Sequence, residues 1–133
     1  MILLDTDVVI DILRQHPPAM AWLDPIVKEK VILPGFVVME LIQGCRNKAE
    51  HENMERKLKN YDVVWPSVET CNVALSVFSR YHLSHGIGIF DALIGQMAVA
   101  LNLPLYTFNQ KHYYIISSLR TIQPYEKASE IKN

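Results

Sequence analysis

Three acidic residues interrupt apolar segments at widely separated points of the chain. Asp5 ends an apolar run, Glu40 lies within the segment FVVMELI, and Asp91 opens the segment DALIGQMAVAL. A carboxylate taken out of water without compensation is costly, and it then finds a partner or becomes protonated. Acids that share one place also repel each other unless a cation neutralises them. Because the ligands would be oxygen atoms, the pattern favours a hard ion such as Mg²⁺ or Mn²⁺.

Each acid also has a purely structural interpretation. Asp91 could be the N-cap of the helix that it precedes, and either Asp5 or Asp7 could cap an earlier helix. Glu40 could form a salt bridge with a lysine or an arginine, since a lone buried carboxylate needs a partner. At the level of sequence both sets of interpretations stay open.

Short apolar runs alternate with helical patterns along the chain, which predicts an α/β fold with a largely parallel sheet. Pro17 and Pro18 are expected to stop the first helix, and Pro25 to limit or kink the second. The strands are expected at residues 2–5, 30–33, 61–65, 103–107 and 119–122, and the helices at residues 7–14, 19–30, 36–45, 48–60, 67–86, 91–101 and 109–117.

The predicted sheet gives the acids a common place. In a parallel sheet the carboxyl ends of the strands lie at one edge, and ligands bind in the crevice there. Asp5 ends the first strand, and Thr107 and Asn109 stand at or just past the end of the fourth. Asp91 begins a helix on that edge, while Glu40 lies one to two turns into the helix after the second strand. A divalent ion held there would ready a water molecule to attack phosphorus.

Composition limits the class of protein. A chain of 133 residues, half of them apolar, predicts a single domain over residues 1–133 with a polar tail from about residue 126. The formal charge of -1 excludes a protein that holds nucleic acid by overall charge alone. Cys45 and Cys71 match no zinc pattern and indicate reduced thiols, and no apolar stretch is long enough to span a bilayer. We therefore expect a soluble, cytoplasmic protein with no membrane partner.

Basic residues around residues 46–59 are candidates for contacts with a polyanion. Glutamates interleave with them, however, and this pattern is more typical of a solvated helix face.

The order DTDVVIDIL, MELIQG and HGIGIFDALIGQMAVALNLPLYTFNQKHY resembles the PIN domain, specifically the VapC-type toxins of bacterial toxin–antitoxin pairs. The resemblance runs from Met1 to about residue 125, and FDALIGQMAVALNLPLYTFN is its most specific part. It implies a three-layer α/β/α sandwich with a central, mostly parallel sheet. It also implies an endoribonuclease that depends on Mg²⁺ or Mn²⁺, an RNA substrate, a homodimer and a cognate antitoxin.

The resemblance assigns catalytic and metal-binding roles to Asp5, Glu40 and Asp91. The family's polar residue after the fourth strand matches Thr107 and Asn109. The fuller family pattern has a fourth acid at or shortly after this point, which this chain lacks. Fewer acids bind a second ion more weakly, so we expect one firmly held metal ion, with a second recruited only together with RNA.

Four further residues are expected to support this site. His112 stands where an acid would complete the pattern, and it could approach a phosphate, although a histidine at a helix edge is more often solvated. Asn109 could bind the ion through its amide oxygen or orient a water molecule. Thr6 and Thr107 are expected to orient Asp5 or the metal-bound water. Asp7 is expected near the site as a helix-start residue and not as a main ligand.

Two other functions fit part of the pattern. ILLDTDVVI also matches the nucleophile motif of haloacid-dehalogenase-like phosphatases, in which Asp5 would attack phosphorus and Asp7 would be the general acid. That family needs a lysine and then an acidic pair on a later strand, whereas after Thr107 the only acids are in the tail. The missing fourth acid alternatively fits a catalytically decayed module that binds RNA or an antitoxin.

Overall fold

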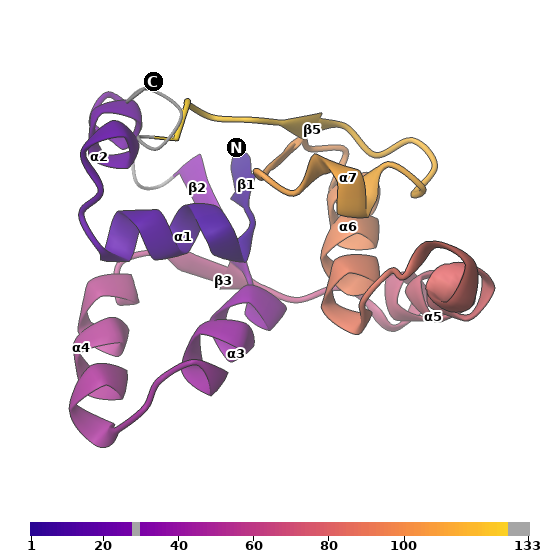
Figure 1. The fold of residues 1–133 in the computed structure, drawn as a ribbon, viewed down its shortest axis with the longest axis horizontal. Helices are drawn as coiled ribbons and strands as arrows, with labels where there is room; N and C mark the ends of the chain where they lie inside the picture. The colour runs from indigo at the N-terminus through magenta and orange to yellow at the C-terminus, as the bar shows by residue number, and fades with distance from the viewer. Residues whose placement is uncertain (28–29, 128–133) are drawn as a thin grey trace.

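The computed structural model describes residues 1–27 and 30–127. Their centre is a five-stranded sheet with the strand order β3-β2-β1-β4-β5, in which every pairing is parallel (Figure 1). The first strand therefore lies in the middle of the sheet. The strands are β1 (Ile2–Leu4), β2 (Val31–Pro34), β3 (Asp62–Val64), β4 (Leu105–Tyr106) and β5 (Thr121–Ile122).

Helices connect the strands and cover the sheet. Figure 1 shows two of them, α2 and α4, to the left of the strands and two others, α5 and α6, to the right. The arrangement confirms the predicted three-layer α/β/α sandwich. The helices are α1 (Thr6–Leu13), α2 (Pro17–Leu23), α3 (Gly35–Gln43), α4 (Lys48–Leu58), α5 (Val68–His85), α6 (Ile89–Leu101) and α7 (Gln110–Tyr113).

The apolar runs of the inner strands form the core. Leu3, Leu4 and Leu105 are at most 1% exposed, as are Val31 and Leu33 on β2. These strands read as continuous apolar runs because helices cover both faces of a parallel sheet. The same packing fixes the place where each strand ends, and therefore the place of the polar residues that follow.

The prolines limit both helices as expected, but the bounds of the second helix were wrong. α1 ends at Leu13, close to its predicted end, and Pro17 and Pro18 begin α2, where the missing N–H of a proline costs nothing. The second helix was expected to reach residue 30 but ends at Leu23, two residues before Pro25. Residues 28–29 of that prediction lie outside the described residues, as do residues 128–133 of the expected polar tail.

The elements near the carboxyl end are shorter than expected. β4 and β5 have two residues each, and α7 ends at Tyr113, four residues before its predicted end. By contrast, α6 begins at Ile89, two residues earlier than expected, with Gly88 as its N-cap. The N-cap alternative for Asp91 is therefore not realised: Asp91 lies inside the first turn and accepts the N–H of the N-cap residue Gly88.

Two of the basic residues around α4 lie beside neighbouring glutamates. Arg46 forms an ion pair with Glu50 at 2.8 Å, and Lys48 lies 3.8 Å from Glu52. The solvated-face interpretation of this segment is thus the better one. In the described parts of the chain, no helix has the length and apolar character needed to cross a bilayer.

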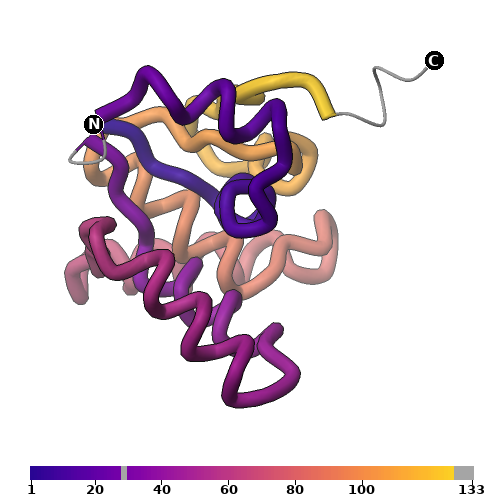
Figure 2. The backbone as a smooth tube through the Cα atoms, turned by 90° about the vertical axis from the view of Figure 1, so that its left-hand side faces the viewer, coloured from indigo at the N-terminus to yellow at the C-terminus, as the bar shows by residue number. Residues whose placement is uncertain are grey.

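The last described residues lie against the first two helices (Figure 2). Tyr125 donates a hydrogen bond to Asp11 at 2.8 Å, and Lys127 donates to the same carboxylate oxygen at 2.7 Å. The Tyr125 ring packs near Trp22, and Lys127 lies 4.1 Å from the centre of the Phe108 ring. The contacts of Tyr125 and Lys127 with Asp11 hold this segment against α1.

Candidate active site

Asp5 lies at the carboxyl end of the central strand and is only 5% exposed. Its backbone N–H continues the pairing with β4 by donating to the Tyr106 carbonyl, and its carboxylate caps α1 by accepting the Thr6 N–H at 2.8 Å on Oδ1. The other oxygen, Oδ2, accepts the Thr107 hydroxyl at 2.8 Å and the Tyr113 hydroxyl at 2.9 Å. Asp5 is therefore both the N-cap and the most tightly surrounded acid of the edge.

The environment disfavours the charge of Asp5. Burial raises the pKa of its carboxyl to about 6, and the nearby charge of Asp7 acts in the same direction. The three hydrogen bonds lower the pKa but do not cancel the effect of burial. No lysine or arginine among the described residues forms an ion pair with Asp5.

Asp7 ties α1 to the segment that follows β4. Its Oδ1 accepts the Val8 N–H at 2.8 Å, and its Oδ2 accepts the Phe108 N–H at 2.9 Å. Burial raises the pKa of this carboxyl, while the hydrogen bonds and the charge of Lys127 partly offset the shift. Asp7 thus lies beside Asp5, and its hydrogen bond with the Phe108 N–H holds α1 against the segment after β4.

Glu40 joins the site through Thr6. The Thr6 hydroxyl donates to Glu40 Oε1 at 2.7 Å, which links α1 to α3. Burial raises the pKa of the half-buried Glu40, as do the charges of Asp91 and Asp7, against the effect of the Thr6 hydrogen bond. The alternative of a salt bridge is not realised, because within residues 1–27 and 30–127 no lysine or arginine pairs with Glu40.

Asp91 lies opposite Glu40 at the start of α6. Its Oδ2 accepts the Gly88 N–H at 3.3 Å, which satisfies a free donor of the helix terminus. Asp91 and Glu40 both line an open pocket of about 280 Å³, together with residues 88–90. The structure therefore brings Glu40 and Asp91 to one pocket, and the charges of both Asp91 and Asp7 act on Glu40, which connects this pair with Asp7 of α1.

Thr107 is at the centre of the site, whereas Asn109 and His112 are at its margin. The completely buried Thr107 hydroxyl donates to Asp5, lies 3.4 Å from Asp7 and accepts the Asn109 N–H at 3.0 Å. The side chains of Asn109 and His112 are exposed, and in the described chain neither forms a hydrogen bond with the acids. Thr107 thus contacts Asp5 as expected. Thr6 reaches Asp5 only through its backbone N–H, and its hydroxyl binds Glu40 instead. Asn109 and His112 have no such contact in the described chain.

Sequence reasoning missed Tyr113. This residue ends α7, is 1% exposed and donates its hydroxyl to Asp5. A buried tyrosine needs an acceptor for its hydroxyl, and that requirement is the signal that could have identified it. The prediction of a longer helix over residues 109–117 did not distinguish the inward face from the outward one.

The donor set suits a hard divalent cation in its chemistry. Four carboxylates lie at one edge of the sheet, and burial raises the pKa of three of them, Asp5, Asp7 and Glu40. Among these three, only Asp7 is stabilised in its charged form by a nearby positive charge, that of Lys127. As the side chains stand, however, no three His, Cys, Asp or Glu residues in the described parts of the chain are arranged to hold one ion together. The carboxylates are instead turned towards hydrogen-bond donors of the protein.

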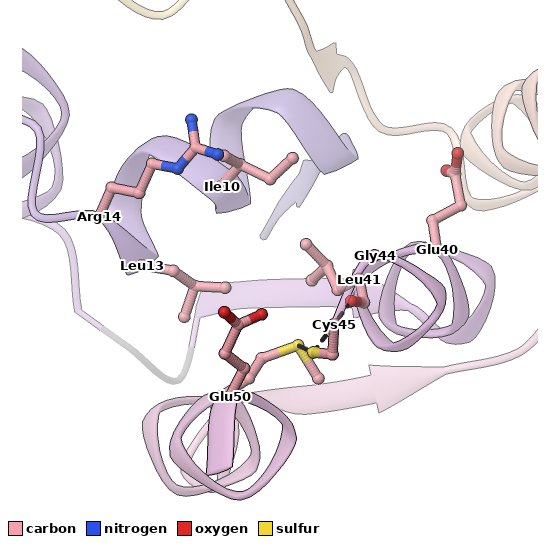
Figure 3. Close-up of a pocket in the computed structure, with 9 residues that line it drawn as sticks. Ile10, Leu13, Arg14, Glu40, Leu41, Gly44, Cys45 and Glu50 are labelled. Carbon is pink, nitrogen blue, oxygen red and sulfur yellow. Dashed lines mark hydrogen bonds between the residues drawn. The ribbon is translucent and has the colours of Figure 1, made fainter. Parts of the chain in front are cut away.

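An apolar groove adjoins the acidic edge (Figure 3). It has a volume of about 390 Å³ between α1, α3 and α4, with Leu13, Leu41 and Met54 in its wall. Glu40 is at its margin, and Figure 3 shows the Glu40 carboxylate on the side away from Glu50. The groove thus lies next to the candidate site but differs from it in being lined mostly by apolar side chains.

Comparison with known proteins connects this geometry to a family. The PIN domain family model matches residues 2–116, which include all four acids, Thr107 and Tyr113. Ribonuclease VapC10 of Mycobacterium tuberculosis is 34% identical over 122 residues, covering 90% of this chain and 91% of that protein. Ribonuclease VapC19 of the same organism is 30% identical over 125 residues, covering 90% and 98%.

Solved structures share the fold. A toxin–antitoxin complex from Klebsiella pneumoniae matches with a TM-score of 0.75 at 20% identity, over 96% of this chain and 100% of that chain. The structure of FitAB bound to an IR36 DNA fragment matches with a TM-score of 0.76 at 26% identity, over 96% and 97%. The resemblance seen in the sequence is therefore confirmed: the chain belongs to the PIN-domain family, of the VapC type.

Proposed function

We propose that the protein is a divalent-metal-dependent endoribonuclease and the toxin of a toxin–antitoxin pair. The observation that carries this proposal is that Asp5, Asp7, Glu40 and Asp91 all lie at the carboxyl edge of the sheet and act on one another's charge, while no lysine or arginine of the described chain forms an ion pair with Asp5 or Glu40. The similarity to two proteins named ribonucleases supports the choice of RNA as the substrate.

The chain's own residues would hold the ion and orient its surroundings. Asp5, Glu40 and Asp91 are the proposed ligands of Mg²⁺, with Mn²⁺ as a substitute, because both ions prefer oxygen atoms. When bound, such an ion neutralises phosphate charge and lowers the pKa of a water molecule that attacks phosphorus. Thr107 fixes Asp5 and Thr6 fixes Glu40, so that two of the three ligands are held by hydroxyl groups.

The pocket lined by Glu40 and Asp91 gives solvent, and hence an RNA phosphate, access to these two of the three proposed ligands. The neutral Asn109, which stands where the fuller family pattern has a fourth acid, supports one firmly held ion rather than two. A catalytic or metal-binding role for Asn109 and His112 would require a change in their side-chain positions when RNA binds.

The partners follow from the family. Several of the similar solved structures are toxin–antitoxin or VapBC complexes, which supports a cognate antitoxin for this chain. A homodimer and a cytoplasmic location remain part of the proposal, in keeping with the family resemblance.

The rival functions have less support. A haloacid-dehalogenase-like phosphatase would need acids on a strand after Thr107, yet the one described strand there, β5 (Thr121–Ile122), has none. A decayed binding module would have no need of acids at all three positions, Asp5, Glu40 and Asp91. Binding of RNA without cleavage in Mg²⁺ or Mn²⁺ is the outcome that would favour the module.

The test is cleavage of tRNA and mRNA by the purified protein with Mg²⁺, with Mn²⁺ and with a chelator. We expect cleavage only with an ion, and we expect Asp91→Asn to abolish it while the fold is retained. Asp62→Asn is the matched control, because it makes the same change at an exposed aspartate of β3. Cleavage in the presence of the chelator, or wild-type rates for Asp91→Asn, would contradict the proposal.

A further inference from the structure

The Asp5 carboxylate is held by two hydroxyl groups on the same oxygen. Thr107 donates to Oδ2 at 2.8 Å from the end of β4, and Tyr113 donates to it at 2.9 Å from the end of α7. Within the described residues, Oδ1 accepts only the Thr6 N–H at 2.8 Å. The two oxygens of Asp5 therefore differ: Oδ2 is engaged by two side chains, and Oδ1 by the backbone alone.

Packing against α6 fixes the Tyr113 ring. Asp91 and Gly95 are four residues apart on this helix and so lie on the same face. A Cβ atom at Gly95 would collide with the Ile116 side chain and would lie 3.2 Å from Cδ1 of Tyr113. The absence of a side chain at residue 95 thus makes room for the ring and lets α7 approach the helix that carries Asp91.

The ring and its hydroxyl have separable roles. A phenylalanine would fill the same apolar space, because the hydroxyl adds only one atom at the end of the ring. Burying that hydroxyl costs free energy unless it forms a hydrogen bond, and its acceptor here is Asp5. Burial and the charges of Asp5, Asp91 and Asp7 raise the pKa of the phenol well above its usual value, so the group stays a donor.

We propose that Tyr113 is a positioning residue for the metal ion: its hydroxyl, together with that of Thr107, fixes the orientation of the Asp5 carboxylate and leaves Oδ1 available to the ion. The inference rests on the proposed function, since it assumes that Asp5 is a ligand. It extends that function to a residue outside the set of acids, held in place by Gly95.

The test compares Mn²⁺ binding to the wild type, Tyr113→Phe and Tyr114→Phe, without RNA. Free Mn²⁺ is measured by electron paramagnetic resonance during titration. Loss of a group that orients a ligand typically weakens metal binding by about 10- to 100-fold, and we expect a change in this range for Tyr113→Phe. Tyr114→Phe removes the same hydroxyl from the neighbouring tyrosine, which is 72% exposed, and we expect it to bind Mn²⁺ as the wild type does.

RNA cleavage by the same proteins provides a second measurement. We expect Tyr113→Phe to cut slowly at low Mn²⁺ and to recover as the Mn²⁺ concentration rises, while its urea midpoint stays near that of the wild type. A crystal structure of this variant gives a third measurement, in which we expect the Asp5 carboxylate to have turned.

The outcomes separate the two proposals. If the wild type binds Mn²⁺ and cuts RNA but Tyr113→Phe binds Mn²⁺ equally tightly, or keeps the Asp5 orientation, then the role of Tyr113 is wrong and the proposed function stands. If the wild type neither binds Mn²⁺ nor cuts RNA, both proposals are overturned.

Discussion

Replacing Asp5 with asparagine in the metal-free protein should increase stability at neutral pH. The pKa of Asp5 is raised from 3.8 to about 6, and each pKa unit corresponds to about 1.4 kcal/mol, so ionised Asp5 costs about 3 kcal/mol in the folded state. Asparagine is never charged and avoids this cost. It has one acceptor oxygen in place of two, however, and it loses about 1 kcal/mol through a missing hydrogen bond. The expected net gain is about 2 kcal/mol.

The sign of the pH dependence follows from proton binding. Between pH 3.8 and about 6 the folded wild type keeps the Asp5 proton and the unfolded chain does not. The free energy of unfolding of the wild type therefore falls, relative to that of Asp5→Asn, as the pH rises through this window. Above the window the difference is constant, and below it the advantage of the variant disappears.

Urea unfolding followed by circular dichroism, with a chelator present, measures this difference between pH 4 and pH 8. Asp11→Asn is the control, because its hydrogen bonds with Lys127 and Tyr125 lower the pKa of Asp11. That variant should lose stability at neutral pH, and its deficit should stay nearly constant between pH 4 and pH 8, because the folded-state pKa of Asp11 lies below its ordinary value of 3.8. If Asp5→Asn is less stable than the wild type at pH 8, or if the difference does not change with pH, burial does not govern the charge of Asp5.

Three other substitutions probe the surroundings of the site. Asp7→Asn should slow RNA cleavage by less than about tenfold, equivalent to about 1.4 kcal/mol, because Asp7 positions the chain and is not a proposed ligand; complete loss would instead favour the phosphatase function. Gly95→Ala should destabilise the domain by about 1–3 kcal/mol in urea, because the new methyl group displaces the Tyr113 region, and it should also weaken Mn²⁺ binding. Lys127→Met removes the 2.7 Å ion pair with Asp11 and should cost about 0.5–1 kcal/mol; an equal cost at low and high salt would show that the charge is not responsible.

The architecture could be predicted because the alternation of strands and helices along the chain and the apolar pattern within each strand both indicate a parallel sheet. Apolar runs such as Leu3-Leu4 and residues 31–33 have no alternative to burial in a parallel sheet, and the acids that follow such runs must lie at the sheet edge. The local signals at Pro17 and Gly88 were ambiguous, because a proline that ends one helix also begins the next well, and a glycine can cap a helix in place of an aspartate. Boundaries therefore failed where two neighbouring elements compete for the same residue.

The hydroxyl groups around Asp5 were only half predictable. Thr107 follows a recognisable strand and was expected to face the site. Tyr113 depends on the close approach of α7 to Gly95, a packing relation between residues 18 positions apart that no local pattern encodes. Glu40 was correctly expected to need a partner, but that partner is the neutral Thr6 hydroxyl and not a basic side chain.

The order of the strands has a consequence for synthesis on the ribosome. Asp5 is synthesised 102 residues before Thr107 and 108 residues before Tyr113, whose hydroxyls hold its carboxylate. Under the proposed function, a growing chain therefore contains its first metal ligand long before it can orient that ligand. The ligand becomes oriented only after β4 has paired with β1 and α7 has packed beside it.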